Sequence, residues 1–279
     1  MSIKDITVVI TTFKSSEKIK RCLNSIDRQC KVLIIENSND LVIKENLEKE
    51  FDNVECILTG SNIGYGSANN IGLKKVSTKY ALILNPDATL HSSTLENFIK
   101  TTKKISEFAI MAPYIQEKNN ENINNQNIFP LEVENVKGFA MFLNLSEFKE
   151  VGFFDENFFF YFEEIDLCKR LTKSGKKIYL IPDIKIDHAG GISHDESIKN
   201  EMELSRNWHW MWSTFNYHKK YKGYLISFFI VLPKLSSAMI KVLIYSVIFN
   251  KDKKKIYYQR LSGLVNAMAG KSSWYRPKV

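Results

Sequence analysis

Short apolar runs alternate with amphipathic segments along the first 113 residues of the chain. The runs are rich in Val, Ile and Leu, as in buried strands, and the segments between them repeat apolar residues at helical spacing, as Ile19, Cys22 and Ile26 do. This alternation predicts an α/β fold with a mostly parallel sheet and helices on both faces. We expect strands over residues 6–10, 32–35, 54–58, 80–84 and 108–113, and helices that begin at Ser15 or Ser16 or cover 41–50, 68–76 and 94–105.

Polar side chains follow four of these predicted strands at the point where each strand ends. In an open α/β sheet, ligands bind outside the carboxyl ends of the strands, so residues from successive strands meet at one edge. Each of them alone is a common turn former, but the joint pattern favours a single binding cleft. The residues are Thr11 and Thr12 after the first strand, Glu36 and Asn37 after the second, Asn62 and Gly64 after the third, and Asn85 and Asp87 after the fourth.

A glycine-rich segment at residues 61–73 follows the third strand and opens a helix. Glycine-lined turns and helix N-termini favour a phosphate group, and Asn69 lies inside the same segment. The spacing differs from the G-x-G-x-x-G pattern of dinucleotide-binding proteins. A second interpretation therefore stays open, in which the glycines provide turn geometry and Asn69 or Asn70 caps the helix.

Asp87 and His188 are suited to a divalent metal ion. Asp87 lies on a turn that Pro86 stiffens, and Mg²⁺ or Mn²⁺ often takes only one or two carboxylates from a protein, with phosphate oxygens as further ligands. His188 ends an alternating row with Ile184 and Ile186. Each residue also has a structural interpretation, Asp87 as a turn residue and His188 as a hydrogen-bonded core residue. We expect His188 to bind metal only if it lies next to Asp87.

Three acidic residues, Glu163, Glu164 and Asp166, follow a phenylalanine-rich stretch. If the chain is helical from about residue 162, Glu164 lies at one end of an otherwise apolar face. A carboxylate there is partly desolvated, which raises its proton affinity and suits a general base. In the alternative interpretation, the three acids form a solvated first turn that the helix dipole favours.

The segment 224–249 contains 19 apolar residues among 26, enough to span a bilayer. Lys234 and Lys241 lie near its middle, however, where each would cost roughly 2.5–3.5 kcal/mol in an inserted helix, and Pro233 interrupts it. We expect peripheral membrane association through 223–255, or else a helical pair that packs on the preceding domain or on a second subunit in a homodimer. The polar residues of the segment form one narrow stripe at helical spacing: Ser227, Lys234, Lys241 and Tyr245.

Composition excludes some classes of protein and locates the charge. With 44% apolar and 25% charged residues, the 279-residue chain is globular, neither disordered nor collagen-like. Four cysteines without a C-x-x-C pair favour a reducing compartment, and the N-terminus does not resemble a signal peptide, so we expect a cytoplasmic protein. The formal charge of +8 lies in residues 223–279, which hold ten basic residues and one acidic residue. Because aliphatic residues separate these charges, the tail favours anionic lipid over nucleic acid.

The chain closely resembles the family 2 inverting glycosyltransferases of the GT-A fold, and most of all their rhamnosyltransferase-like branch. The resemblance runs from about residue 6 to 191 and implies a Rossmann-like catalytic domain over 1–222, followed by a helical segment over 223–279. It rests on seven motifs in order: ITVVITTF, LIIENS, NIGYGSANNIGL, ILNPDATL, VKGFAMFLN, GFFDENFFFYFEEIDLCKRL and IKIDHAGG.

The resemblance implies roles for individual residues. Asp87 matches the metal-binding acid of the DXD-type motif, His188 completes the metal site, and Glu164 matches the catalytic base. This chain departs from the motif in having Asn85 at its first acidic position and Glu164 where the family has aspartate, so Glu163 or Asp166 could act as the base instead. The nucleotide-sugar side comprises Thr11, Thr12, Glu36, Asn62, Gly64, Asn69 and Asn85, and the acceptor side Gly138, Glu163 and Asp166.

The implied activity is the inverting transfer of a sugar from a nucleoside-diphosphate sugar, dTDP-rhamnose-like or a UDP-sugar, to a hydroxyl of a lipid-linked or cell-surface glycan. It implies Mg²⁺ or Mn²⁺ and a location on the inner face of the cell membrane, and it requires residues 87, 164 and 188 to meet around one diphosphate. A sugar nucleotidyltransferase would have a glycine-rich basic loop after the first strand, whereas TTFKSSEK has no glycine. A non-catalytic nucleotide-sugar or glycan-binding module stays open because of Asn85 and Glu164.

Overall fold

The computed structural model describes residues 2–114, 130–188, 190 and 193–278, which form two compact units. The asparagine-rich sequence at 117–128, whose composition predicts an exposed loop, lies outside the described residues. The domain boundary expected between residues 222 and 223 falls inside the second unit, so that division stays a prediction. The first unit comprises Met1–Ile63, Ser67–Phe154 and Leu167–Asp195, and the second Gly64–Gly66, Asp155–Asp166 and Glu196–Val279.

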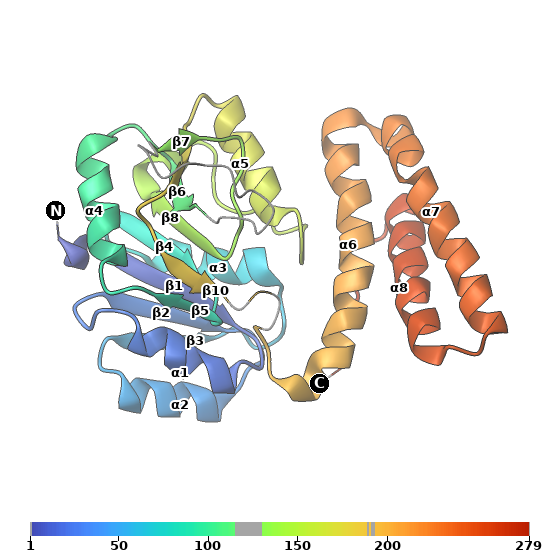
Figure 1. The fold of residues 1–279 in the computed structure, drawn as a ribbon, viewed down its shortest axis with the longest axis horizontal. Coiled ribbons are helices and arrows are strands. Elements are labelled where there is room, and N and C mark those ends of the chain that lie inside the picture. The colour runs from blue at the N-terminus through green and yellow to red at the C-terminus, as the bar shows by residue number, and fades with distance from the viewer. Residues whose placement is uncertain (1, 115–129, 189, 191–192, 279) are drawn as a thin grey trace. The chain divides into compact units, whose positions relative to one another are not determined.

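A mixed, mostly parallel sheet forms the centre of the first unit (Figure 1). As predicted, β1 (Ile6–Thr12) is parallel to β2 (Lys31–Glu36) and to β4 (Tyr80–Leu84), and β2 is parallel to β3 (Val54–Leu58). The strand β8 lies antiparallel between β4 and β6, and its sequence had not been expected to form a strand. The spatial order within the described residues is β3 (Val54–Leu58), β2 (Lys31–Glu36), β1 (Ile6–Thr12), β4 (Tyr80–Leu84), β8 (Ala140–Asn144), β6 (Ile110–Pro113), β9 (Ile178–Ile181) and β7 (Leu131–Glu132).

Helices cover both faces of this sheet, which confirms the predicted fold class. Val8 and Ile10 share a core with the apolar faces of α1 (Ser16–Asn24), α2 (Leu41–Glu50) and α4 (Thr94–Lys104). Val9 points to the opposite face, since side chains alternate along a strand. There, α3 (Tyr65–Lys75) packs so closely that a Cβ on Gly72 would lie 2.5 Å from Val9 Cγ1.

Two details differ from the local expectations. Helix α1 begins at Ser16, but the Ser15 hydroxyl donates to the Phe13 and Ser193 carbonyl oxygens and so does not cap the helix. Beside the large sheet, β5 (Ala88–Leu90) and β10 (Ile186–His188) form an antiparallel pair of their own. The register of this pair sets His188 opposite Ala88.

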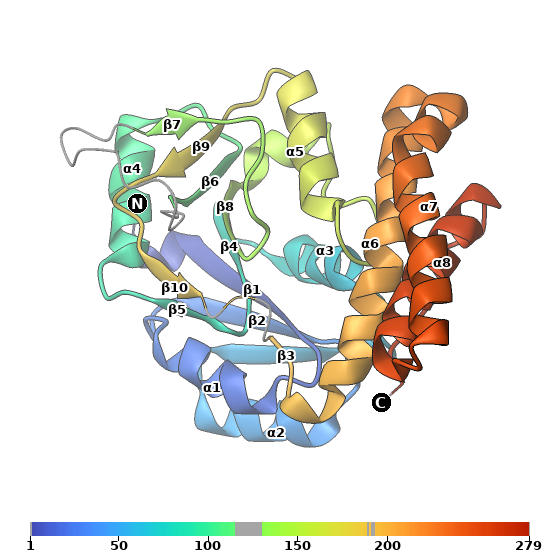
Figure 2. The same ribbon diagram turned by 45° about the vertical axis from the view of Figure 1, so that its right-hand side comes forward.

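Three long helices, α6 (Lys199–Lys222), α7 (Tyr224–Val247) and α8 (Lys251–Met268), lie side by side in the second unit (Figures 1 and 2). Trp208, Phe215, Val231 and Leu264 form their shared core. Helix α8 approaches α6 closely at Gly263, where a Cβ would overlap the carbonyl oxygen of Trp208. The start of α5 (Glu163–Lys173) belongs to this unit, while the rest of α5 belongs to the first.

Candidate active site

The carboxyl ends of β1 and β2 bring polar residues together, as their parallel register requires. Thr12 pairs with Glu36 in the register, and the Asn37 amide donates to the Thr12 carbonyl oxygen at 2.8 Å. The hydroxyl oxygens of Thr11 and Thr12 are buried and have no hydrogen-bond partner among the described residues. A buried hydroxyl without a partner is costly, so these two oxygens are suited to a polar ligand.

Glu36 is fully buried and holds the loop that follows β2. Its carboxylate accepts hydrogen bonds from the Ser38 amide, from the Ser38 hydroxyl at 2.5 Å and from the Asp40 amide at 2.6 Å. The side chain therefore has a structural task in the loop, and direct contact between Glu36 and a nucleotide stays a prediction.

The side chain of Asn37 ties this edge to the loop after β3. Its Nδ2 donates to Asn62 Oδ1 at 3.0 Å, and its Oδ1 accepts from the Ile63 amide at 3.0 Å and from the Thr59 hydroxyl at 3.1 Å. Asn62 thus lies beside the ends of β1 and β2, as the strand pattern predicted. Asn37 is the residue that organises the edge.

The glycine-rich turn has a steric reason for its first glycine. Gly64 has φ +94°, and a Cβ at this position would lie 2.5 Å from the Phe159 carbonyl oxygen. That same oxygen accepts a hydrogen bond from the Tyr65 amide at 3.0 Å. Asn69 is fully buried within α3. The turn-geometry interpretation of Gly64 is therefore supported, and contact of Gly64 or Asn69 with a phosphate stays a prediction.

Asp87 and His188 lie side by side, although 100 residues separate them in the sequence. His188 Nε2 is 3.4 Å from Asp87 Oδ1, and the same oxygen accepts from the Ser193 hydroxyl at 3.1 Å. The pairing of β5 with β10 brings the two residues together. Burial raises the pKa of Asp87, but His188 and Ser193 outweigh this effect and hold the pKa below its ordinary value. Asp87 is therefore a carboxylate at neutral pH.

These residues fit a divalent ion that shares its coordination with a ligand. Asp87 Oδ2 is buried without a hydrogen-bond partner among the described residues and lies next to an imidazole nitrogen, and this pair of donors suits Mn²⁺ or Mg²⁺. The described part of the chain contains no cluster of three or more His, Cys, Asp or Glu residues that could hold a metal ion. Any ion at Asp87 and His188 would therefore need further oxygen ligands from substrate or water.

Phe139 forms one wall beside this pair. Its ring stacks on the His188 imidazole with centroids 4.3 Å apart, and its carbonyl oxygen accepts from the Asn85 amide at 2.8 Å. Gly138, expected on the acceptor side, immediately precedes it. Ser193 was not predicted from the sequence, although it lies only two residues after the seventh motif.

Glu163 and Glu164 begin α5 as two adjacent and largely enclosed carboxyl groups. Each has an Oε2 atom that is buried without a hydrogen-bond partner in the described structure. Burial raises the pKa of Glu163 well above its ordinary value, and the neighbouring charge of Glu164 adds to the rise. Burial also raises the pKa of Glu164, against the opposing effect of backbone N–H groups at the helix start. The interpretation of a solvated acidic turn is therefore wrong, and the predicted desolvation of Glu164 is confirmed.

The backbone just before these glutamates is strained. Tyr161 and Phe162 have φ of 66° and 71°, which is rare for residues other than glycine. Trp210 of α6 contacts both rings, with centroid distances of 5.2 Å to Tyr161 and 5.5 Å to Phe162. The Ser213 hydroxyl donates to the Phe160 carbonyl oxygen at 2.9 Å. A strained backbone of this kind persists only where neighbouring contacts hold it in place, and here Trp210 and Ser213 of α6 make those contacts.

Asp166, on the next turn of α5, is fully buried and ion-paired. Lys220 Nζ lies 2.6 Å from Asp166 Oδ1 and 2.7 Å from Asp155 Oδ2, and the Tyr221 hydroxyl donates to Asp166 Oδ1 at 2.7 Å. The Asp166 carboxylate is therefore already engaged by an ammonium group and a phenol. Of the three acids, Glu164 is the one that combines raised proton affinity with partial exposure.

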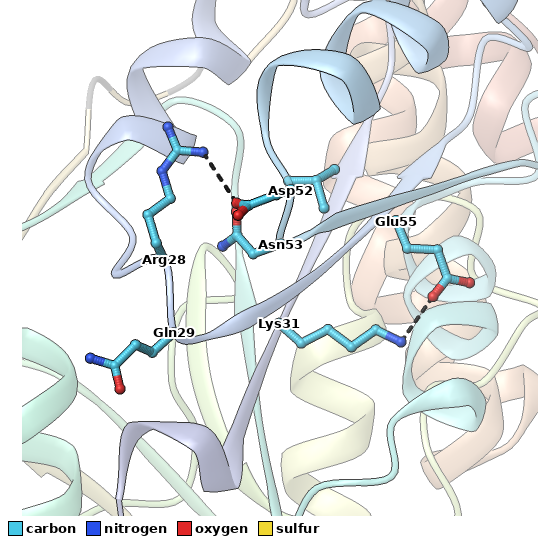
Figure 3. A pocket seen from close by; sticks show the side chains of 7 residues that line it. Arg28, Gln29, Lys31, Asp52, Asn53 and Glu55 are labelled. Atoms are coloured by element: carbon cyan, nitrogen blue, oxygen red, sulfur yellow. Dashed lines mark ion pairs between the residues drawn. The ribbon is translucent and has the colours of Figure 1, made fainter.

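A hollow of about 380 Å³ lies elsewhere on the first unit (Figure 3). Its lining residues surround the start of β2 at Lys31 and the start of β3 at Val54, at the edge opposite to the carboxyl ends. Lys31 and Glu55 form an ion pair across it at 2.9 Å. Because ligands of such sheets bind at the carboxyl ends, this hollow is not the candidate active site.

The family model for glycosyl transferase family 2 matches residues 7–168, more than half of the chain. The chain belongs to this family. The matched region includes the ends of β1 to β4, Asp87 and the acidic start of α5, while His188 lies beyond it.

Curated relatives include several rhamnosyltransferases. The chain is 25% identical to the rhamnosyltransferase WbbL of Escherichia coli over 247 residues, which covers 75% of this chain and 91% of WbbL. It is 20% identical to an N-acetylglucosaminyl-diphospho-decaprenol L-rhamnosyltransferase of Mycobacterium tuberculosis, covering 65% and 75%. The hexosyltransferase Agl10 of Haloferax volcanii is 24% identical, but the match covers 62% of this chain and only 64% of Agl10. The expected rhamnosyltransferase-like branch is confirmed.

Solved structures confirm the GT-A fold. The mannosyltransferase PcManGT of Pyrobaculum calidifontis, in complex with GDP-Man and Mn²⁺, matches with a TM-score of 0.60 at 12% identity, covering 96% of this chain and 88% of PcManGT. Staphylococcus aureus TarS residues 1–349, in complex with UDP-GlcNAc, match with a TM-score of 0.53 at 12% identity, covering 97% and 93%. At this identity, both matches concern the fold.

Proposed function

We propose that the protein is an inverting glycosyltransferase that uses a nucleoside-diphosphate sugar. The observation that carries the proposal is the Asp87–His188 pair at 3.4 Å, at the carboxyl-terminal edge where family 2 enzymes hold the donor. Asp87 is ionised, has a buried oxygen without a hydrogen-bond partner, and follows β4 directly. The two residues would hold Mg²⁺ or Mn²⁺, which would neutralise negative charge on the departing diphosphate.

Glu164 is the proposed general base. The acceptor hydroxyl forms a bond to the anomeric carbon, its proton passes to a Glu164 carboxylate oxygen, and the bond between the anomeric carbon and the phosphate oxygen breaks with its electron pair leaving on the diphosphate. Attack from the face opposite the leaving group inverts the anomeric configuration. A partly desolvated carboxylate gains proton affinity and so accepts the proton more readily.

The donor side is proposed to comprise Thr11, Thr12, Asn62 and Asn85, with Glu36, Gly64 and Asn69 shaping it. The orphaned hydroxyls of Thr11 and Thr12 support contact with a polar ligand. The names of two relatives, the L-rhamnosyltransferase of Mycobacterium tuberculosis and the dTDP-rhamnosyl transferase RfbF of Shigella flexneri, favour dTDP-rhamnose as donor and a lipid-linked acceptor. A UDP-sugar and a cell-surface glycan are the alternatives. Such an acceptor places the reaction at the inner face of the cell membrane.

The decisive experiment is a donor screen on the purified full chain. Release of nucleoside diphosphate from dTDP-rhamnose and from UDP- and GDP-sugars is measured with Mn²⁺, with Mg²⁺ and with EDTA, and the anomeric configuration of the product is determined by NMR. We expect metal-dependent release from one class of donor and an inverted product. Donor binding without release, for any acceptor tested, would instead support a non-catalytic nucleotide-sugar-binding module.

A further inference from the structure

Helix α7 shows its apolar residues to the outside of the three-helix bundle. Leu225, Phe229, Leu243 and Val247 are 73%, 68%, 67% and 75% exposed, respectively. Together with Leu232 and Ile240, they recur at intervals of three to eight residues along one side of the helix. This spacing makes a single continuous stripe, called here the outer stripe of α7.

Three of the four residues of the polar stripe of α7 contact the bundle, while Lys234 is exposed. Ser227 is fully buried and its hydroxyl donates to the Gly223 carbonyl oxygen at 2.6 Å. Lys241 Nζ donates to the Tyr257 hydroxyl of α8 at 3.3 Å, and the Tyr245 ring stacks on that of Tyr257 with centroids 5.4 Å apart. Helix α7 thus turns Ser227, Lys241 and Tyr245 toward its own bundle, beside the buried Val231 and Ala238. Its larger apolar residues are exposed.

A cluster of cations adjoins one end of the outer stripe. Phe249, 86% exposed, is followed by Lys251, Lys253, Lys254 and Lys255 at the start of α8, and all four lysines are exposed. Residues 223–279 carry ten basic residues against one acidic residue. An exposed apolar surface of this length is rare in monomeric soluble proteins and indicates a binding surface. The cluster of cations beside it favours a partner that is apolar inside and anionic at its surface.

Helix α7 is long and apolar enough to cross a membrane by length and composition. Two sets of contacts oppose a crossing of the membrane. Lys241 and Tyr245 contact Tyr257 of α8, and the chain after α8 returns to α6. Trp212 Nε1 donates to the Lys271 carbonyl oxygen at 3.0 Å, and His209 Nε2 lies 2.9 Å from the Tyr275 carbonyl oxygen. Insertion across the bilayer would break these contacts and carry lysines into the hydrocarbon.

We propose that the outer stripe of α7 lies in the plane of an anionic phospholipid leaflet, with Lys251–Lys255 bound to its headgroups. The stripe enters the acyl boundary and the inward face remains packed against α6 and α8, so that the bundle docks without unfolding. This inference deepens the proposed place of the enzyme at the membrane. It does not depend on sugar transfer, because vesicle binding is measured without donor or acceptor.

The test is flotation of the full chain with vesicles of phosphatidylglycerol and phosphatidylcholine, and with phosphatidylcholine alone. We expect strong flotation with the anionic vesicles and weak flotation with the neutral ones. The triple variant Leu225→Gln, Phe229→Gln, Leu243→Gln should reduce binding by roughly 100-fold or more, since three exposed apolar side chains lose their contact with the acyl region. Changing Lys253, Lys254 and Lys255 to Gln should cost about fivefold per lysine, and only with anionic vesicles.

Matched controls keep the test falsifiable. Leu41→Gln with Val42→Gln changes two apolar residues of α2 that are 54% and 66% exposed, and should leave flotation unchanged. Circular dichroism checks that each variant is folded. Unchanged flotation of the triple variant would overturn the proposal. Light scattering that shows a dimer dissociated by the triple variant, without vesicle binding, would assign the stripe to a second copy, and resistance of membrane-bound protein to alkaline carbonate would indicate a crossing.

Discussion

The two carboxylate regions of the protein have opposite electrostatics. At Asp87, burial is outweighed by His188 and Ser193, and the pKa falls below its ordinary value. At Glu163 and Glu164, burial acts with less opposition, and the pKa of both groups rises. Environments that push the proton affinities of carboxyl groups apart allow one to stay charged and bind a cation while the other takes up a proton. The contrast supports the proposed metal role of Asp87 and the proposed base role of Glu164.

The largest expected effect comes from removing the proposed base. Glu164→Gln keeps the size and shape of the side chain but replaces one carboxylate oxygen by an NH2 group and removes its ability to take the proton, so kcat should fall by roughly 10²–10⁴-fold. Donor affinity, measured by calorimetry, should stay unchanged. The matched variant Glu163→Gln should retain far more activity, because Glu163 is almost fully enclosed. A reversed ranking of the two variants would assign the base role to Glu163.

The metal side of the comparison is tested by Asp87→Ala. This variant should lose the dependence of turnover on Mn²⁺ and most of the turnover itself, since the ionised ligand is gone. Ser193→Ala is a milder control that removes one hydrogen bond from Asp87 Oδ1, and should weaken the response to Mn²⁺ by about fivefold, which corresponds to roughly 1 kcal/mol. Mn²⁺ titrations in the presence of nucleoside diphosphate measure both. An unaltered metal response in Asp87→Ala would remove Asp87 from the site.

A smaller effect should appear in the pH dependence. The base must be ionised, so kcat should decline as pH falls through the raised pKa of Glu164, at a pH above the ordinary value of 4.5. Stability should change in the opposite direction, because a raised carboxyl pKa means that the folded state holds the proton longer than the unfolded state. Between the ordinary and the raised pKa, the free energy of unfolding should therefore fall as pH rises. Glu164→Gln should flatten part of this stability profile.

Much of the sheet could be predicted because its signal is local. The apolar runs at β3 and β4 gave the strand bounds, and the spacing of Ile19, Cys22 and Ile26 gave the buried face of α1. β8 was missed because its residues lie inside a long motif and its antiparallel place depends on contacts with β4 and β6 that are distant in sequence.

The sequence suggested the candidate site residues, whose roles stay predictions, but it did not predict the contacts that bring them together. Asp87 and His188 meet through two strands of three residues each, whose pairing has no local signature. Burial of Glu164 followed from its place on an apolar face, whereas the strained turn at Tyr161 and Phe162 depends on Trp210 from another helix. For α7, the spacing of the polar stripe was visible in the sequence. The contacts of Lys241 and Tyr245 with Tyr257 were not, because they depend on how α8 packs.

Gly263 determines how near two helix axes can come. Because a Cβ on this residue would overlap the Trp208 backbone, any larger residue should force α6 and α8 apart. In the proposed membrane contact, the outer stripe of α7 requires only that its side chains be apolar. Exchanges among apolar residues should therefore be tolerated in the outer stripe of α7, whereas nearly every substitution at Gly263 should be destabilising.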